Sequence, residues 1–316
     1  MYQKFFGLKD SPFNVNPDPR YLYMTKQTQE ALAGLTYGIQ NRKGFILLTG
    51  EVGTGKTTLL NQLLDWLRAQ RMSTAFIFNS RLDVNQLFDF IMADFEIPCE
   101  SREKSVVLMR LNSWLLERYR TGGTAVLIID EAQNLSTDIL EEIRLLTNLE
   151  TTTQKLIQIV LSGQPELEEK LKLPQLRQLR QRITMRCRTA PLTLDETFRY
   201  VAERLRIGGA NGEAIFSKEA VQTVHNYSRG IPRVVNALCE HSLIDAYVDG
   251  VRPVPAQIVE EVAREFQLDE IAPTAPVGSV FKAQQSANTQ ALLQDLDSIL
   301  ERLRQSTTVP VRERKP

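Results

Sequence analysis

The segment from Gly50 to Thr57 constrains the fold of this chain more than any other. It reads Gly-Glu-Val-Gly-Thr-Gly-Lys-Thr and matches the pattern GxxxxGK[ST] in full. An apolar run at residues 45–49 precedes it, and a helical pattern at residues 57–70 follows. Strand, glycine-rich loop and helix in this order predict a phosphate-binding loop. Glycines let backbone N–H groups surround an anion, and the helix N-terminus adds its dipole.

Two side chains of this loop have distinct expected roles. Lys56 is expected to reach the β- and γ-phosphates of a nucleoside triphosphate, and we count it among the catalytic residues. The Thr57 hydroxyl is expected to ligate Mg²⁺. We therefore predict ATP and Mg²⁺ as cofactors. The predicted nucleotide-binding residues of the loop and helix start are Gly50, Glu51, Val52, Gly53, Thr54, Gly55, Lys56, Thr57 and Thr58.

The rest of the chain divides into regions with different patterns of apolar residues. From Gly44 short apolar runs alternate with helical patterns, which predicts an α/β fold with a five-stranded parallel sheet and helices on both faces. We expect its strands at residues 45–49, 74–79, 125–130, 156–162 and 183–189. After Pro191 the pattern predicts only helices, at residues 194–207, 217–228, 231–248 and 255–266.

These sequence patterns predict five regions. They are an N-terminal segment (1–43), the α/β nucleotide-binding domain (44–192), a helical lid (193–268), a linker (269–288), and an amphipathic helix with a basic tail (289–316). The apolar stripe of that last helix lies within residues 292–303. It is a candidate for partner binding or self-association, and packing on its own domain is the alternative.

A second motif follows the apolar run at residues 125–129. Asp130 and Glu131 end that predicted strand at the carboxyl edge of the sheet, where ligands bind in such folds. We expect Asp130 to hold Mg²⁺, directly or through water. Glu131 is expected to orient and polarise the attacking water as a general base.

Polar residues also end the neighbouring predicted strands. Ser162 or Gln164 is expected to hydrogen-bond the attacking water or the γ-phosphate, and Asn79 is expected to restrain Glu131. The alternative for each is a turn residue that satisfies its own backbone.

Arginines supply the remaining candidates. Several arginines occupy residues 177–188, and Arg182, with Arg180 as second choice, is the candidate to contact the γ-phosphate of a neighbouring subunit. Such a contact needs a ring or filament. A solvated basic face and DNA phosphate binding are the alternatives. Arg233, just after Gly230-Ile231-Pro232, is expected to point from the lid to the nucleotide, and an ordinary helix start is its alternative.

Composition sets limits on partners and compartment. The 38 basic and 38 acidic residues give no net charge, so binding to DNA or anionic lipid would need a local patch. The three cysteines form no CxxC pair and fit a reducing compartment. No apolar run of about 18 residues occurs, so we expect no membrane span. These features predict a cytoplasmic protein, or one held at the inner membrane through a partner.

The motifs together resemble the AAA+ ATPases, and one branch more closely. The segments Phe6-Gly7-Leu8, Asp130-Glu131-Ala132-Gln133-Asn134-Leu135, Gly163-Gln164-Pro165-Glu166-Leu167 and Gly230-Ile231-Pro232-Arg233 are similar to those of the general-secretion-pathway protein A (ExeA) family. The resemblance covers about residues 1–268. It implies that the N-terminal segment packs near the adenine, that Arg182 is the arginine finger, and that Arg233 is a second sensor.

The resemblance leaves two functions open. One is an oligomeric ATPase, ring or filament, that assembles or remodels a protein partner in secretion or pilus machinery. Its relatives typically continue into a membrane span and a peptidoglycan-binding domain, patterns not found in this sequence. The alternative is an ATP-dependent regulator of DNA transposition, of the TnsC, TniB and MuB type, which binds duplex DNA and recruits a transposase. The absence of net charge mildly disfavours the alternative. A weaker third reading is a nucleotide-binding switch with little turnover.

Overall fold

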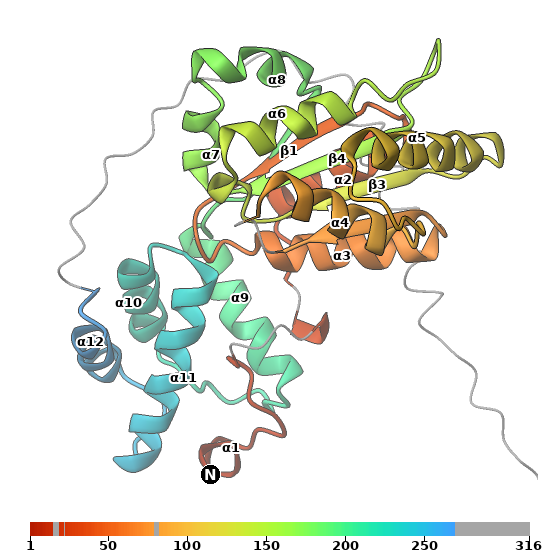
Figure 1. The fold of residues 1–316 in the computed structure, drawn as a ribbon. Helices are drawn as coiled ribbons and strands as arrows, with labels where there is room; N and C mark the ends of the chain where they lie inside the picture. Colours follow the sequence, from red (N-terminus) through yellow and green to blue (C-terminus); the bar gives the residue numbers. More distant parts are fainter. Residues whose placement is uncertain (15–18, 22, 79–81, 269–316) are drawn as a thin grey trace, which may run out of the picture. The chain divides into compact units, whose positions relative to one another are not determined.

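Five parallel strands form the central sheet. The computed structural model describes residues 1–14, 19–21, 23–78 and 82–268 (Figure 1). The strand order is β2-β3-β4-β1-β5, and every neighbouring pair is parallel. The strands are β1 (Phe45–Thr49), β2 (Ser73–Ile77), β3 (Ala125–Ile129), β4 (Ile157–Gly163) and β5 (Met185–Arg188). The predicted α/β class with five parallel strands is confirmed.

Burial explains why these runs form strands. Every residue of β1, β3 and β4 is buried, as expected for central strands covered on both faces. The edge strands β2 and β5 are partly exposed and carry more polar residues. Polar Ser73 and Thr74 lie in the first of these strands and Arg186 and Arg188 in the second.

Helices cover both faces of the sheet. Alternate residues of each strand point to opposite faces. One face packs on α4 (Val84–Asp94), α5 (Lys104–Arg120) and α6 (Thr137–Leu146). On the other face, a Cβ at Gly38 of α2 (Lys26–Gln40) would lie 2.6 Å from Ile46 Cδ1 of β1. The helix α3 (Lys56–Ala69) packs beside α2.

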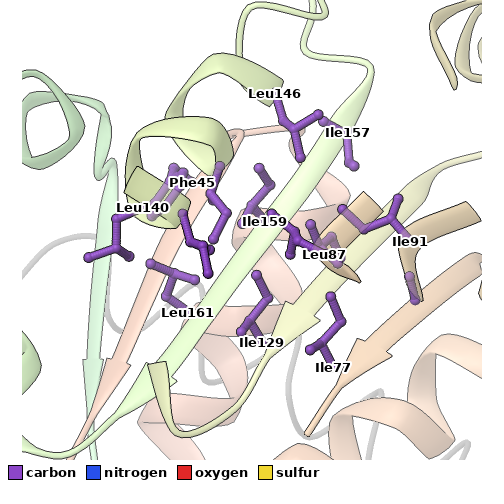
Figure 2. Packing of buried hydrophobic residues seen from close by; sticks show 14 of the residues in the cluster. Phe45, Ile77, Leu87, Ile91, Ile129, Leu140, Leu146, Ile157, Ile159 and Leu161 are labelled. Atoms are coloured by element: carbon purple, nitrogen blue, oxygen red, sulfur yellow. The ribbon is translucent and has the colours of Figure 1, made fainter. Parts of the chain in front are cut away.

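The packing of the first face is dense. Figure 2 shows strand residues interleaved with leucines and isoleucines of α4 and α6. Each fully buried Leu or Ile contributes about 1.5–3 kcal/mol through the hydrophobic effect. The labelled residues are Phe45, Ile77, Leu87, Ile91, Ile129, Leu140, Leu146, Ile157, Ile159 and Leu161.

A second apolar core lies among the helices that follow the sheet. These are α9 (Leu194–Ile207), α10 (Lys218–Ser228), α11 (Pro232–Val248) and α12 (Ala256–Glu265), which we call the lid. All four agree with the predicted helices to within a residue at each end. Side-chain caps fix two of the starts: Thr193 accepts from the Glu196 N–H, and Ser217 from the Ala220 N–H.

The beginning of the chain joins this second core. Helix α1 (Tyr2–Phe6) buries both of its end residues there, and Leu8 and Phe13 are buried in the same cluster. Helix α2 instead packs on β1 and β5. The first 13 residues therefore pack with the lid, and α2 packs with the sheet.

Short elements complete the described part. They are η1 (Pro19–Tyr21), η2 (Ala132–Asn134), α7 (Pro165–Lys170), η3 (Pro174–Leu176) and α8 (Arg177–Arg182). Among the described residues, no helix is both long and apolar enough to cross a membrane. Asn79, the linker at 269–288 and the amphipathic segment at 289–316 lie outside the described residues.

Candidate functional site

The glycine-rich loop lies between β1 and α3, at the carboxyl edge of the sheet. Gly53 and Gly55 have φ angles of 79° and 93°, a left-handed backbone that glycine adopts without strain. At Gly50, whose φ is ordinary, space is the constraint, because an added Cβ would lie 2.0 Å from Thr189 Oγ1. The three glycines thus allow a tight loop whose backbone other groups can approach closely.

The loop is also hydrogen-bonded to the segment that follows β5. The hydroxyls of Thr54 and Thr189 lie 2.7 Å apart, so the segment after β5 is joined to the loop. The first residues of α3 have no side-chain cap, because the N-cap residue is Gly55. Their backbone N–H groups are therefore available to an anion at the loop.

Lys56, the first residue of α3, is buried against the loop. Its Nζ donates to the carbonyl oxygens of Gly50, at 2.8 Å, and Glu51, at 3.0 Å. Burial lowers the pKa of Lys56, and the nearby carboxylates of Glu131 and Asp130 oppose that change. The ammonium group is thus held beside the loop backbone and close to both acidic residues.

Asp130 is the centre of a hydrogen-bond network. Its Oδ1 accepts from the Ser162 hydroxyl at 2.7 Å and from the Glu131 N–H at 2.9 Å. Its Oδ2 accepts from the Thr57 hydroxyl at 3.3 Å. Asp130 is buried, and Ser162 is fully buried. The structure therefore brings Thr57 and Asp130 together as predicted, and it directs the Ser162 hydroxyl to Asp130.

Glu131 lies beside this network in a left-handed backbone conformation, with φ of 52°. Its Oε2 accepts from the side-chain amides of Gln133 and Gln164, the latter at 3.2 Å. Gln164 thus contacts Glu131. The sequence pattern assigns the restraint of Glu131 to Asn79. Gln133 was not singled out for a role from the sequence. The sequence signal that could have identified Gln133 is its position two residues after Glu131.

The lid reaches the loop through the start of α11. The Arg233 N–H donates to the Gly53 carbonyl at 3.3 Å, and the Arg233 side chain is exposed. Gly230 makes this entry possible, because a Cβ there would lie 1.9 Å from the Leu192 carbonyl oxygen. The backbone of Arg233 thus contacts the loop, and its predicted role toward the nucleotide stays a prediction.

Part of this network lines a cavity of about 420 Å³, including Lys56, Thr57, Glu131, Gln164 and Arg233. One part of the lining is the loop with Lys56, Thr57 and Glu131, together with Arg233. Another part, which we call the aromatic end, is polar and aromatic. That end contains Asn14, Tyr21, Tyr23, Thr25, Thr28, Tyr200, Arg204 and Asn236. Residues of the N-terminal segment therefore line the same cavity as the glycine-rich loop.

Arg204 organises the aromatic end. Its buried guanidinium lies 4.8 Å from the Tyr21 ring centre and 5.4 Å from that of Tyr200. Its Nε donates to the Pro12 carbonyl, and the Tyr200 hydroxyl donates to Asn236 Oδ1 at 2.8 Å. Sequence reasoning missed these three lid residues. Their spacing on α9 and α11 looks like that of ordinary helix residues, so only the packed structure identifies them.

The two arginine-finger candidates lie away from this cavity. Arg182 is half-buried and donates to the Thr147 hydroxyl of its own chain. Arg180 is exposed on α8. Neither lines the cavity.

Comparison with known proteins supports this description. A family model described as an AAA domain matches residues 39–171. General secretion pathway protein A of Aeromonas hydrophila is 45% identical over 251 residues, which are 79% of this chain and 46% of that protein. The chain therefore spans less than half the length of this curated relative.

Solved structures share the fold. Cdc6p of Pyrobaculum aerophilum has a TM-score of 0.64 at 21% identity, covering 82% of this chain and 71% of that one. Drosophila ORC, in a structure bound to DNA, has a TM-score of 0.62 at 18% identity, covering 98% of this chain and 80% of that one.

The fold and the AAA domain place this chain in the class of AAA+ ATPases. Within that class it is a relative of general secretion pathway protein A, the ExeA family, as the sequence motifs predicted.

Proposed function

We propose that this chain binds ATP with Mg²⁺ between the glycine-rich loop and the lid, and hydrolyses it. One observation carries the proposal: Lys56, Thr57 and Glu131 line a single cavity at the carboxyl edge of the sheet. Phosphoryl transfer to water requires an ammonium group for the phosphates, a hydroxyl for Mg²⁺ and a carboxylate for the attacking water.

The residues beside Thr57 fit a magnesium ion. A hydroxyl and a carboxylate oxygen 3.3 Å apart are hard oxygen donors, which Mg²⁺ prefers. Thr57 and Asp130 would hold the ion, which when bound neutralises charge on the phosphates. Ser162 orients Asp130 through its hydrogen bond, so its contribution would be the geometry of that carboxylate.

Glu131 and Arg233 would act on the two sides of the γ-phosphate. The Glu131 carboxylate would accept a proton from the attacking water and orient it. Arg233 lines the cavity from the lid and would contact a phosphate oxygen. Because its backbone bonds to Gly53, the lid would sense what the loop holds.

Turnover would require a neighbouring subunit. Arg182 and Arg180 lie outside the cavity of their own chain, so an arginine finger from α8 would serve an adjacent copy. We propose a ring or filament in which ATP lies at the subunit interface. Its shape would pass the nucleotide state to a partner.

For the partner, we propose secretion or pilus-type machinery, since the 45% identical relative is a general secretion pathway protein. The site of action would be the cytoplasm, or the inner membrane reached through that partner. Duplex DNA, with recruitment of a transposase, is the second candidate, favoured by the exposed Arg177, Arg180, Arg186 and Arg188.

Two measurements test these proposals. ATP hydrolysis should depend on Mg²⁺ and be lost in Asp130→Asn. Intact ATP binding without hydrolysis by the native chain would instead support a nucleotide switch. Duplex DNA binding should then be measured with a non-hydrolysable ATP analogue across a salt series. No binding at low salt keeps the secretion proposal, whereas nucleotide-dependent binding that weakens steeply with salt replaces it with the DNA one.

A further inference from the structure

The Glu131 carboxylate is held by two neutral amides from two different strand ends. Gln133 follows β3 in the turn η2, and Gln164 follows β4 at the N-cap position of α7. Both donate to the same oxygen, Oε2 of Glu131. We propose that Gln133 and Gln164 are positioning residues that fix this carboxylate for attack on the nucleotide. This inference rests on the proposed hydrolysis.

The two glutamines are themselves locked together. Gln133 Oε1 accepts from the backbone N–H of Gln164 at 3.1 Å, which closes a ring of three residues with Glu131. The amide of Gln133 lies against Gly163, where a Cβ would come within 2.9 Å of Oε1. The Gln133 side chain therefore has one arrangement that satisfies both its donor and its acceptor.

The backbone around the ring is fixed as well. Lys170, at the end of α7, donates to the carbonyl oxygens of Gln133, at 2.6 Å, and Leu135, at 2.7 Å. Glu131 is tied at its N–H to Asp130 and at its carbonyl to the Asn134 N–H, at 3.0 Å. Helix α7 and the turn η2 thus form one rigid support for the carboxylate.

The chemistry of the two amides suits a general base. A lysine or arginine at either position would hold the carboxylate but would also neutralise it. An amide donor fixes the orientation and leaves the negative charge. Because both amides use Oε2, the other oxygen, Oε1, is the one assigned to the attacking water. Glu131 and Gln164 both line the cavity that Lys56 also lines.

The test removes each amide while keeping the side-chain length. In Gln133→Met and Gln164→Met, kcat should fall about 10- to 100-fold, since misplaced catalytic groups cost this much. The dissociation constant for ATP should change less than about threefold, because the carboxylate does not bind the ground-state nucleotide. Gln158→Met is the matched control: Gln158 is a fully buried glutamine of β4 that bonds to Gly44 and Lys155, and it should leave kcat unchanged.

A double-mutant comparison separates positioning from a structural role. In a Glu131→Ala background, Gln133→Met should cause no further loss of residual turnover. An additional loss there, an unchanged kcat in the single variants, or a raised kcat would each overturn the inference. Failure of the proposed function is distinguishable, because the native chain would then show no ATP hydrolysis. Native turnover in Glu131→Ala would instead show that Glu131 is not the base. If Glu131→Ala is inactive and both methionine variants are fully active, only the positioning inference fails.

Discussion

The backbone N–H of Arg233 donates a hydrogen bond to the carbonyl oxygen of Gly53 over 3.3 Å. The bond joins the first turn of the lid helix α11 to the middle of the glycine-rich loop. A Cβ at Gly53 would lie 2.9 Å from the Arg233 Cβ, so the two backbones are also in close contact. The lid position is therefore linked to the loop that would hold the phosphates.

Gly230→Ala tests the geometry of that lid entry. The new Cβ would meet the Leu192 carbonyl at 1.9 Å, and φ at this position is 73°. We expect a loss of more than about 2 kcal/mol in the free energy of unfolding, because a clash adds to the backbone strain. Gly122→Ala is the control, since φ there is 78° with no atom within 4 Å. Equal losses in denaturant unfolding of the two variants would contradict the predicted clash.

Lys56→Ala tests the loop directly. The variant removes the buried ammonium that lies beside the loop carbonyls. ATP binding, measured by calorimetry, should weaken at least about tenfold, because a charge-assisted phosphate contact is lost. Lys172→Ala, an exposed lysine paired with Glu169, should bind ATP like the native chain. Native ATP affinity in Lys56→Ala would contradict the assignment of this segment as a phosphate-binding loop.

Arg182 and Arg180 are tested by mixing subunits. Either arginine substituted by alanine should lower turnover about 10³-fold or more if it is the finger. Mixing that variant with Lys56→Ala should restore part of the activity, because each partner supplies what the other lacks. Arg182 is bonded to Thr147 in its own chain and Arg180 is exposed, so both are measured. No recovery in either mixture would count against action between subunits.

Arg204→Met tests the support of the aromatic end. The Pro12 carbonyl and the Tyr200 hydroxyl would both lose a charged donor. We expect a loss of about 1–3 kcal/mol in the free energy of unfolding, together with faster proteolysis near residue 12. Arg206→Met, which breaks only an exposed ion pair with Glu203, should cost less than about 1 kcal/mol. Similar losses in both variants would show that Arg204 does not secure the N-terminal segment.

Much of this arrangement was predictable from the sequence. The strands β1, β3 and β4 are buried on both faces, so they appear in the sequence as short, largely apolar runs. The glycine-rich loop and the acidic pair at Asp130 and Glu131 follow such strands directly. The parallel order then places both at one edge of the sheet. The meeting of Thr57 with Asp130 follows from these rules alone.

Other features depend on packing that no local pattern encodes. The strand-end rule placed Ser162 at the correct edge, but only the structure shows that its hydroxyl bonds to Asp130. The first residues, such as Phe6 and Phe13, have no periodicity that indicates which core buries them. Arg204 has a helical spacing like that of a surface arginine, yet it is buried among aromatic rings.

The most direct test of hydrolysis at this site is ATP binding and turnover in Glu131→Gln. The substitution keeps the size of the side chain and removes the base. The variant should bind ATP with Mg²⁺ within about threefold of the native affinity, and its kcat should fall at least about 100-fold. Native turnover in this variant would show that Glu131 is not the base and would contradict the proposed mechanism.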